Sequence, residues 1–139
     1  MQIYVDGSLK FTTPDDMLNT KILLTGGMHT ITAKAWDDRG AFSKTIDLMA
    51  CTNNLSRAVQ ICLPQDGSNS NSPVHIVASA ATSLAFSQLQ VYIDGVVRFH
   101  SSAKYVDISR TLSLGMHRIT VKGWDSSGAF LSTVDLTVQ

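Results

Sequence analysis

Apolar and polar residues alternate along much of this 139-residue chain with the period of two that predicts β-strands. In its second half, such runs are separated by short stretches rich in Gly, Ser, Asn and Asp, and Asp94-Gly95 predicts a type I′ hairpin turn. The predicted strands cover residues 58–63, 74–82, 88–94, 96–100, 105–114, 116–124 and 130–138. No segment has the 3.6-residue period of an amphipathic helix. The pattern therefore predicts an all-β fold, typical of a β-sandwich.

The strongest signal in the sequence is an internal repeat with an offset of 88 residues. QIYVDGSLKF at Gln2 recurs as QVYIDGVVRF at Gln90, and GMHTITAKAWDDRGAF at Gly27 recurs as GMHRITVKGWDSSGAF at Gly115. About 20 of 49 aligned positions are identical, without insertion or deletion. Residues 51–88 have no counterpart upstream, so the chain holds one whole unit and the back end of another.

The repeat predicts tandem units of which the first is truncated. Residues 1–50 form a partial unit that lacks its first two strands, residues 51–57 form a linker, and residues 58–139 form a complete unit. Met1 aligns with Leu89, an apolar strand position, so it is either an internal methionine of a longer array or a true start. The first residues lack the basic and apolar regions of a signal peptide, so an export signal would lie outside this chain.

Composition then narrows the classes of function. Lys+Arg and Asp+Glu both number 11, and every acidic residue is aspartate. A neutral chain has no bulk electrostatic reason to bind nucleic acid, and no apolar run approaches the roughly 18 residues that span a bilayer. Without glutamate there is no Glu acid–base or zincin-type chemistry, and no GxSxG motif is present. We therefore expect no enzymatic activity, no cofactor, no nucleic-acid partner and no membrane insertion.

Four short motifs carry a resemblance to a known family. They are VDG at Val5–Gly7, IDG at Ile93–Gly95, and the WDxxGAF turns at Trp36–Phe42 and Trp124–Phe130. In this context the chain resembles the bacterial Ig-like domains that occur in tandem in secreted and cell-surface proteins. The resemblance implies an Ig-like antiparallel β-sandwich and an extracellular, non-catalytic module. Unlike antibody domains, the chain has no Cys pair around a central Trp.

Cys51 and Cys62 flank the segment that enters the complete unit. In the exported setting that the resemblance implies, they favour a disulfide, which would stabilise the fold by roughly 3 kcal/mol and stiffen the joint between units. Two unpaired thiols are the alternative. The spacing matches no zinc pattern, and we expect no metal site. Asn54 begins the only N-x-S/T sequon and is a candidate glycosylation site.

His29 and His117 occupy equivalent Gly-Met-His positions in the two units. They are either ligands or strand-start residues whose rings turn against the neighbouring loop, and the second interpretation is favoured because His75 and His100 add no ligand spacing. The aspartates of the Trp-Asp turns are interpreted as turn residues, since Ca²⁺ requires about six oxygen ligands. These turn residues are Asp37, Asp38 and Asp125.

Tyr4 and Trp36, with their counterparts Tyr92 and Trp124, are candidate contact residues. In each strand these aromatic residues alternate with the apolar ones, so both rings of a unit are expected on the outer face of the sheet. Such a patch suits stacking on a sugar or on another protomer. The alternative is a cross-strand pair covered by long polar side chains.

The sequence thus predicts a non-enzymatic structural module of an extracellular bacterial fibre or adhesive surface array. The partial unit would expose strand edges and an apolar face, which leaves three explanations. It is a piece of a longer array, it is partly disordered, or another chain donates the missing strands and links subunits head to tail into a filament. The expected partners are copies of the chain itself. The alternative function is a carbohydrate-binding or spacer module of a secreted enzyme, with glycans as partners.

Overall fold

A computed structural model describes residues 1–139 and divides them into two compact units, Met1–Ala50 and Cys51–Gln139. Twelve strands make up both units, and all but one of their pairings are antiparallel. The all-β prediction is confirmed.

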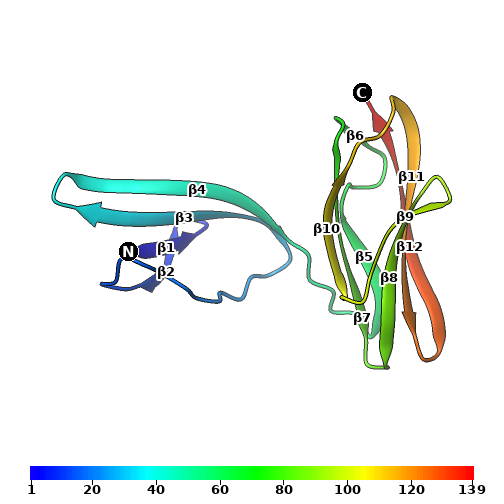
Figure 1. Cartoon of the computed structure of the whole chain (residues 1–139), viewed down its shortest axis with the longest axis horizontal. Helices are drawn as coiled ribbons and strands as arrows, with labels where there is room; N and C mark the ends of the chain where they lie inside the picture. Colours follow the sequence, from blue (N-terminus) through cyan, green and yellow to red (C-terminus); the bar gives the residue numbers. More distant parts are fainter. The chain divides into compact units, whose positions relative to one another are not determined.

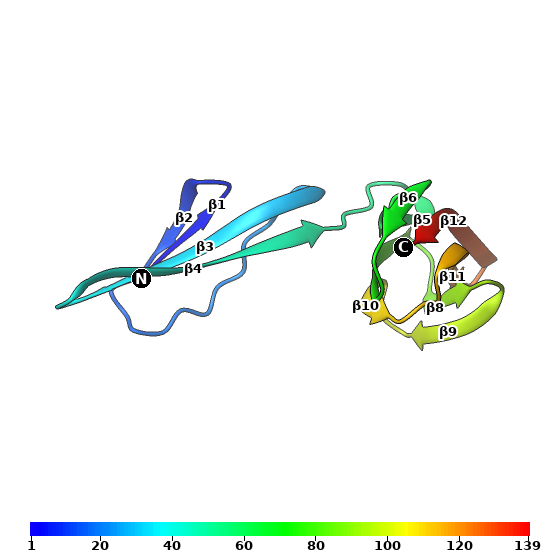
Figure 2. The same ribbon diagram turned by 90° about the horizontal axis from the view of Figure 1, so that it is seen from above.

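The second unit is a β-sandwich of a three-stranded and a five-stranded sheet (Figure 1). Figure 2 views these sheets end-on, with the core enclosed between them. Their strand orders are β10-β7-β5 and β6-β12-β11-β8-β9. The strands are β5 (Arg57–Leu63), β6 (Ser68–Ser70), β7 (Val74–Thr82), β8 (Phe86–Ile93), β9 (Val96–Ser101), β10 (Tyr105–Arg110), β11 (Gly115–Asp125) and β12 (Gly128–Val138).

All seven predicted strands of this unit are present, and one more was missed. Ser68–Ser70 was expected to belong to a polar turn, but it forms β6 and pairs in parallel with the end of β12. It has no apolar residue that could show a strand period, so only its backbone pairing identifies it. The predicted hairpin turn is confirmed, because Asp94 and Gly95 take φ values of 52° and 80°.

The core of the second unit is built by alternate residues of the facing sheets. Ile76 of β7 is fully buried, as are Leu89 of β8 and Ile119 of β11. β7 is the central strand of its sheet and pairs with both β5 and β10. Its alternate side chains therefore cover the middle of the five-stranded sheet, and β10 depends on β7 as its only pairing partner.

The first unit is a single four-stranded sheet with the order β2-β1-β3-β4. At the offset of 88 these strands correspond to β9, β8, β11 and β12, and they pair in the same register. Residues 17–22, the counterpart of β10, form no strand. Without a counterpart of β7 they have no edge to pair with. The strands are β1 (Gln2–Val5), β2 (Ser8–Thr12), β3 (Gly27–Asp37) and β4 (Gly40–Ala50).

No second sheet covers the inner face of the four-stranded sheet. Phe42 is 60% exposed and Leu48 37%, whereas their counterparts Phe130 and Leu136 in the second unit are 9% and 2% exposed. We refer to this surface as the open face. Its side chains come from β1, β3 and β4 and are Ile3, Ile31, Ala35, Phe42, Ile46 and Leu48.

Residues 51–57, expected to form a linker, group with the second unit. Cys51 is buried, and Asn53 Nδ2 donates to the carbonyl oxygens of Ala58 at 3.0 Å and Ser79 at 3.4 Å. The expected Cys51–Cys62 disulfide is formed, with the two Cα atoms 5.7 Å apart. Both cysteines belong to the second unit, so the bridge closes a loop inside that unit.

Equivalent leucines in the two units test the difference in burial. We expect Leu136→Ala to lower the free energy of unfolding of the second unit by about 2–5 kcal/mol, because it leaves a cavity between the sheets. Leu48→Ala should lower that of the first unit by less than about 1 kcal/mol, since Leu48 already contacts solvent. Urea denaturation of the full chain measures both. Equal losses would show that the open face is covered.

Candidate functional site

The aromatic pair of the second unit lies on the outer face of the five-stranded sheet. Tyr92 of β8 and Trp124 of β11 are both half-buried, and Gln90 Oε1 accepts hydrogen bonds from the Tyr92 hydroxyl at 2.8 Å and from Trp124 Nε1 at 3.1 Å. Lys122 Nζ lies 4.9 Å from the Tyr92 ring centroid and 5.7 Å from that of Trp124. The two rings lie on the outer face as predicted, and Lys122 lies across both, which agrees with the alternative interpretation of a covered cross-strand pair.

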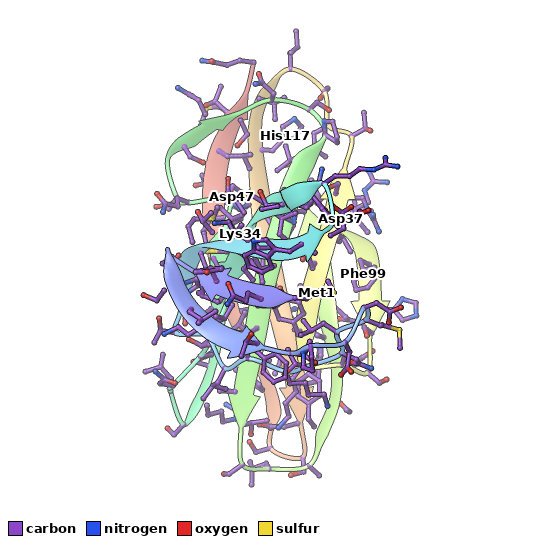
Figure 3. The ribbon with its side chains drawn as sticks, turned by 90° about the vertical axis from the view of Figure 1, so that its left-hand side faces the viewer. Met1, Lys34, Asp37, Asp47, Phe99 and His117 are labelled. Carbon is purple, nitrogen blue, oxygen red and sulfur yellow. A yellow bond between two sulfur atoms is a disulfide. The ribbon has the colours of Figure 1, made fainter.

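The corresponding residues of the first unit are less covered. The Tyr4 hydroxyl donates to Gln2 Oε1 at 2.6 Å. The Nζ atom of Lys34, a residue labelled in Figure 3, lies 5.5 Å from the Tyr4 ring centroid. Trp36 is 51% exposed, and its indole N–H has no hydrogen-bond partner. Trp36 is therefore the predicted contact residue with the most accessible ring.

A histidine–aspartate clamp fixes the hairpin turn of the second unit. His117 (labelled in Figure 3) places Nδ1 2.7 Å from Asp94 Oδ2 and Nε2 2.9 Å from the Ser113 carbonyl oxygen. Asp94 Oδ1 accepts the backbone N–H of Arg118 at 2.9 Å. A carboxylate and a carbonyl oxygen can only accept, so the protonated imidazolium donates to both of them. The Ser113 hydroxyl, 3.3 Å from Nε2, can donate to that nitrogen in the neutral form.

The first unit repeats the contacts to the aspartate, the carbonyl oxygen and the backbone N–H. His29 Nδ1 lies 2.7 Å from Asp6 Oδ2, and Nε2 lies 2.9 Å from the Thr25 carbonyl oxygen. Asp6 Oδ1 accepts the backbone N–H of Thr30 at 2.9 Å. The favoured interpretation of these histidines, that the ring turns against the neighbouring loop, agrees with this geometry. The aspartate partner was missed, although Asp-Gly precedes Gly-Met-His at the same spacing in both units.

Hydrogen bonding shifts the titration of both members of each clamp. The bond to Asp94, and then the bond to the Ser113 carbonyl, raise the pKa of His117 above its ordinary value of 6.5. The backbone N–H of Arg118, and then His117, lower the pKa of Asp94 below 3.8. In the first unit, the hydrogen bond between His29 and Asp6 is the main cause of two shifts. It raises the pKa of His29 and lowers the pKa of Asp6.

Asp125 does more than its predicted role in a turn. Its buried carboxylate accepts hydrogen bonds from Arg57 Nε at 2.9 Å, the Thr82 hydroxyl at 2.8 Å and the Ser127 backbone N–H at 2.9 Å. Arg57, as the main cause, holds the pKa of Asp125 well below its usual range. The group ties the start of β5 and the end of β7 to the β11–β12 turn, and so connects the two sheets.

The first unit has no such connection between sheets. Asp37, the counterpart of Asp125, is exposed and accepts only the Arg39 backbone N–H at 2.8 Å, which is the predicted turn role. Asp38 is exposed as well. Arg57 could not be predicted as the partner of Asp125, because the two residues are 68 positions apart.

The remaining candidate residues lie apart from one another. His75 pairs with Asp107 at 2.7 Å, while His100 is exposed and makes no hydrogen bond through its ring. No group of three or more His, Cys, Asp or Glu side chains is placed to hold a metal ion. No helix has the length and apolar character to cross a bilayer. Asn54 is exposed, and its glycosylation stays a prediction.

The structure is similar to solved tandem modules. The fibronectin(III)-like modules of CbhA from Clostridium thermocellum match 99% of this chain and 76% of theirs, with a TM-score of 0.52 and 19% identity. An endo-beta-1,4-mannanase from Thermotoga petrophila matches 63% of this chain, which spans only 20% of the mannanase chain, with a TM-score of 0.54 and 17% identity. No family model and no curated protein sequence matches the chain. At this level of identity the matches establish an Ig-like or fibronectin-like β-sandwich fold.

The clamps predict a stability that depends on pH. Because the folded-state pKa of each histidine lies above 6.5, their contribution is complete below pH 6.5 and is lost as the pH rises through the folded value. Asp94 and Asp6 have folded-state pKa values below 3.8, so their contribution to stability is lost as the pH falls through those values. We expect the Tm of the second unit to fall between about pH 6 and pH 9, and His117→Asn to flatten that slope. His100→Asn is the control, and an unchanged slope in His117→Asn would refute the assignment.

Proposed function

We propose that this chain is a non-catalytic structural segment of an extracellular bacterial protein built from tandem Ig-like units. It acts in a fibre or an adhesive surface array, and its first unit associates with another copy of the protein. The tandem repeat and the fold support the architecture, and the disulfide suits an oxidising, extracellular location.

The open face is the observation that carries this proposal. Phe42 and Ile46 are 60% and 52% exposed on the open face, where Lys44 stands between them on the same side of β4. Exposed apolar patches mark interaction sites on soluble proteins. Charge does not oppose association, because the chain has equal numbers of acidic and basic residues. Strand donation between subunits would cover this face and link them head to tail.

A second candidate function is a carbohydrate-binding or spacer module of a secreted enzyme. The accessible Trp36 ring favours a sugar contact, since saccharides stack on exposed aromatic faces. The similarity to part of a mannanase chain agrees with a module of such an enzyme. In the second unit, however, Lys122 lies across both aromatic rings, so a sugar would have to displace it.

Self-association separates these two functions. We expect the full chain to form dimers or longer assemblies at micromolar concentration, measured by size-exclusion chromatography with light scattering and by negative-stain microscopy. Ile46→Asp should shift the protein to monomer, because it places a charge on the open face. Leu131→Asp is the control, since Leu131 is also exposed but belongs to the second unit.

A chain that stays monomeric and binds sugars would favour the second candidate function, the module of a secreted enzyme. A stable monomer that binds oligosaccharides on a glycan array, with binding lost in Trp36→Ala or Trp124→Ala, would contradict the structural role. Robust hydrolysis of a polysaccharide by the pure chain would contradict both functions.

A further inference from the structure

A hollow of about 340 Å³ lies in the second unit between the β8–β9 hairpin and the β10–β11 connection. Residues of β9 and β10, the edge strands of the two sheets, line it, and Figure 2 shows these strands on the same side of the sandwich. The clamp residues Asp94 and His117 form part of its wall. Its volume is at the lower end of the range of small-molecule sites, which begins near ~300 Å³.

Two arginines from the two sheets line this hollow without an acidic partner. Arg98 belongs to β9 and Arg110 to β10, and neither forms an ion pair. Arg110 is half-buried, and its Nη1 donates to the Ser109 carbonyl oxygen at 2.9 Å. Its Cζ lies 5.7 Å from the ring centroid of Phe99 (labelled in Figure 3). A half-buried guanidinium without a counter-charge is unfavourable, so the hollow suits an anion.

Asp94 is the only acidic residue that lines the hollow, and its carboxylate is already engaged. Its Oδ2 lies 2.7 Å from His117 Nδ1, and its Oδ1 accepts the backbone N–H of Arg118 at 2.9 Å. The clamp therefore occupies both carboxylate oxygens and leaves neither for the arginines. With two arginines and one aspartate, the hollow carries a net positive charge, which suits a singly charged anion better than a dianion.

We propose that this hollow binds the carboxylate group of a sugar acid. The guanidinium groups present paired N–H donors that match a planar carboxylate. The hydroxyls of Thr111 and Ser113 also line the hollow and can pair with the hydroxyls of a sugar. Ile93 and Leu112 provide an apolar wall for the ring carbons. All of these residues belong to the second unit, so the inference does not depend on the proposed self-association.

The first unit provides an internal comparison for this site. A corresponding hollow of about 220 Å³ lies beside its own clamp, and Lys10 lines it at the position of Arg98. Ile22 stands at the position of Arg110, so this hollow has one cation where the second unit has two. The clamp is thus common to both units, whereas the pair of arginines is particular to the second. We therefore expect binding at the second unit only.

Titration of the isotope-labelled full chain with galacturonate, followed by the backbone amide NMR spectrum, tests the site. We expect saturable shifts confined to residues 93–98 and 110–117, with a Kd of about 1 mM or tighter, and none at residues 5–10 and 22–29. Galactose, which lacks the carboxylate, should give no saturable shift. Acetate should bind at least about tenfold more weakly, because it lacks the ring and its hydroxyls.

Three arginines of the second unit provide matched variants. Arg98→Gln and Arg110→Gln each remove one cation from the hollow and should weaken galacturonate binding about tenfold or more. Arg98→Lys keeps the charge without the planar fork and should restore only part of the affinity. Arg118→Gln is the control, because the Arg118 side chain pairs with Asp135 at 2.7 Å and does not line the hollow. Unchanged circular dichroism of all four variants would exclude unfolding as the cause.

A trimer of galacturonate distinguishes two sources of the same acid. Tighter binding of the trimer than of the monomer would identify an acidic polysaccharide as the source, and weaker binding would identify the free sugar acid. Equal binding of galactose or of acetate would overturn the sugar acid as the ligand. Binding that survives both glutamine variants in the hollow, or equal shifts in the first unit, would overturn the assigned residues. The absence of any saturable shift would overturn the site and leave the proposed self-association in place.

Discussion

Burial of an apolar sheet face by a second layer is the constraint on which both units depend. In the second unit, β5, β7 and β10 form that layer, and the core lies between it and the five-stranded sheet. The first unit repeats the β8, β9, β11 and β12 part of this design in the same register, but the apolar residues Phe42, Ile46 and Leu48 of β4 stay exposed. The same side chain, Leu48 or Leu136, is therefore a surface residue in one unit and a core residue in the other.

Interactions within the repeated strands and turns are kept in both units, whereas interactions with the covering layer are found only in the second unit. The His29–Asp6 and His117–Asp94 clamps are alike because all their partners lie within the repeated strands and turns. The Arg57–Asp125 ion pair exists only in the second unit, since Arg57 belongs to the covering layer. Once that layer is absent, Asp37 keeps the turn hydrogen bond and loses the connection between sheets. What the first unit lacks is thus confined to contacts that the second sheet would provide.

Much of the fold could be predicted from the sequence because alternation and turn residues are local. The seven strands of the second unit and the Asp94-Gly95 turn were expected on this basis, and the Cys51–Cys62 disulfide was expected from the family resemblance. β6 was missed because three polar residues carry no strand period. The loss of the β10 counterpart at residues 17–22 was missed because strand formation there depends on a partner distant in sequence. The position of Lys122 across the Trp124 ring could not be predicted, because strand alternation defines the face of a side chain but not its conformation.

Native-state hydrogen exchange of the monomeric full chain tests the central claim most directly, because it compares two corresponding hairpins of the repeat in one molecule. If the second layer is what stabilises such a hairpin, amides of β11 and β12 exchange only through global unfolding of the second unit, and those of β3 and β4 exchange at least about a hundredfold faster. Equal protection of the two hairpins in a dilute monomer would contradict this claim, because it would mean that the four-stranded sheet is stable without a covering layer.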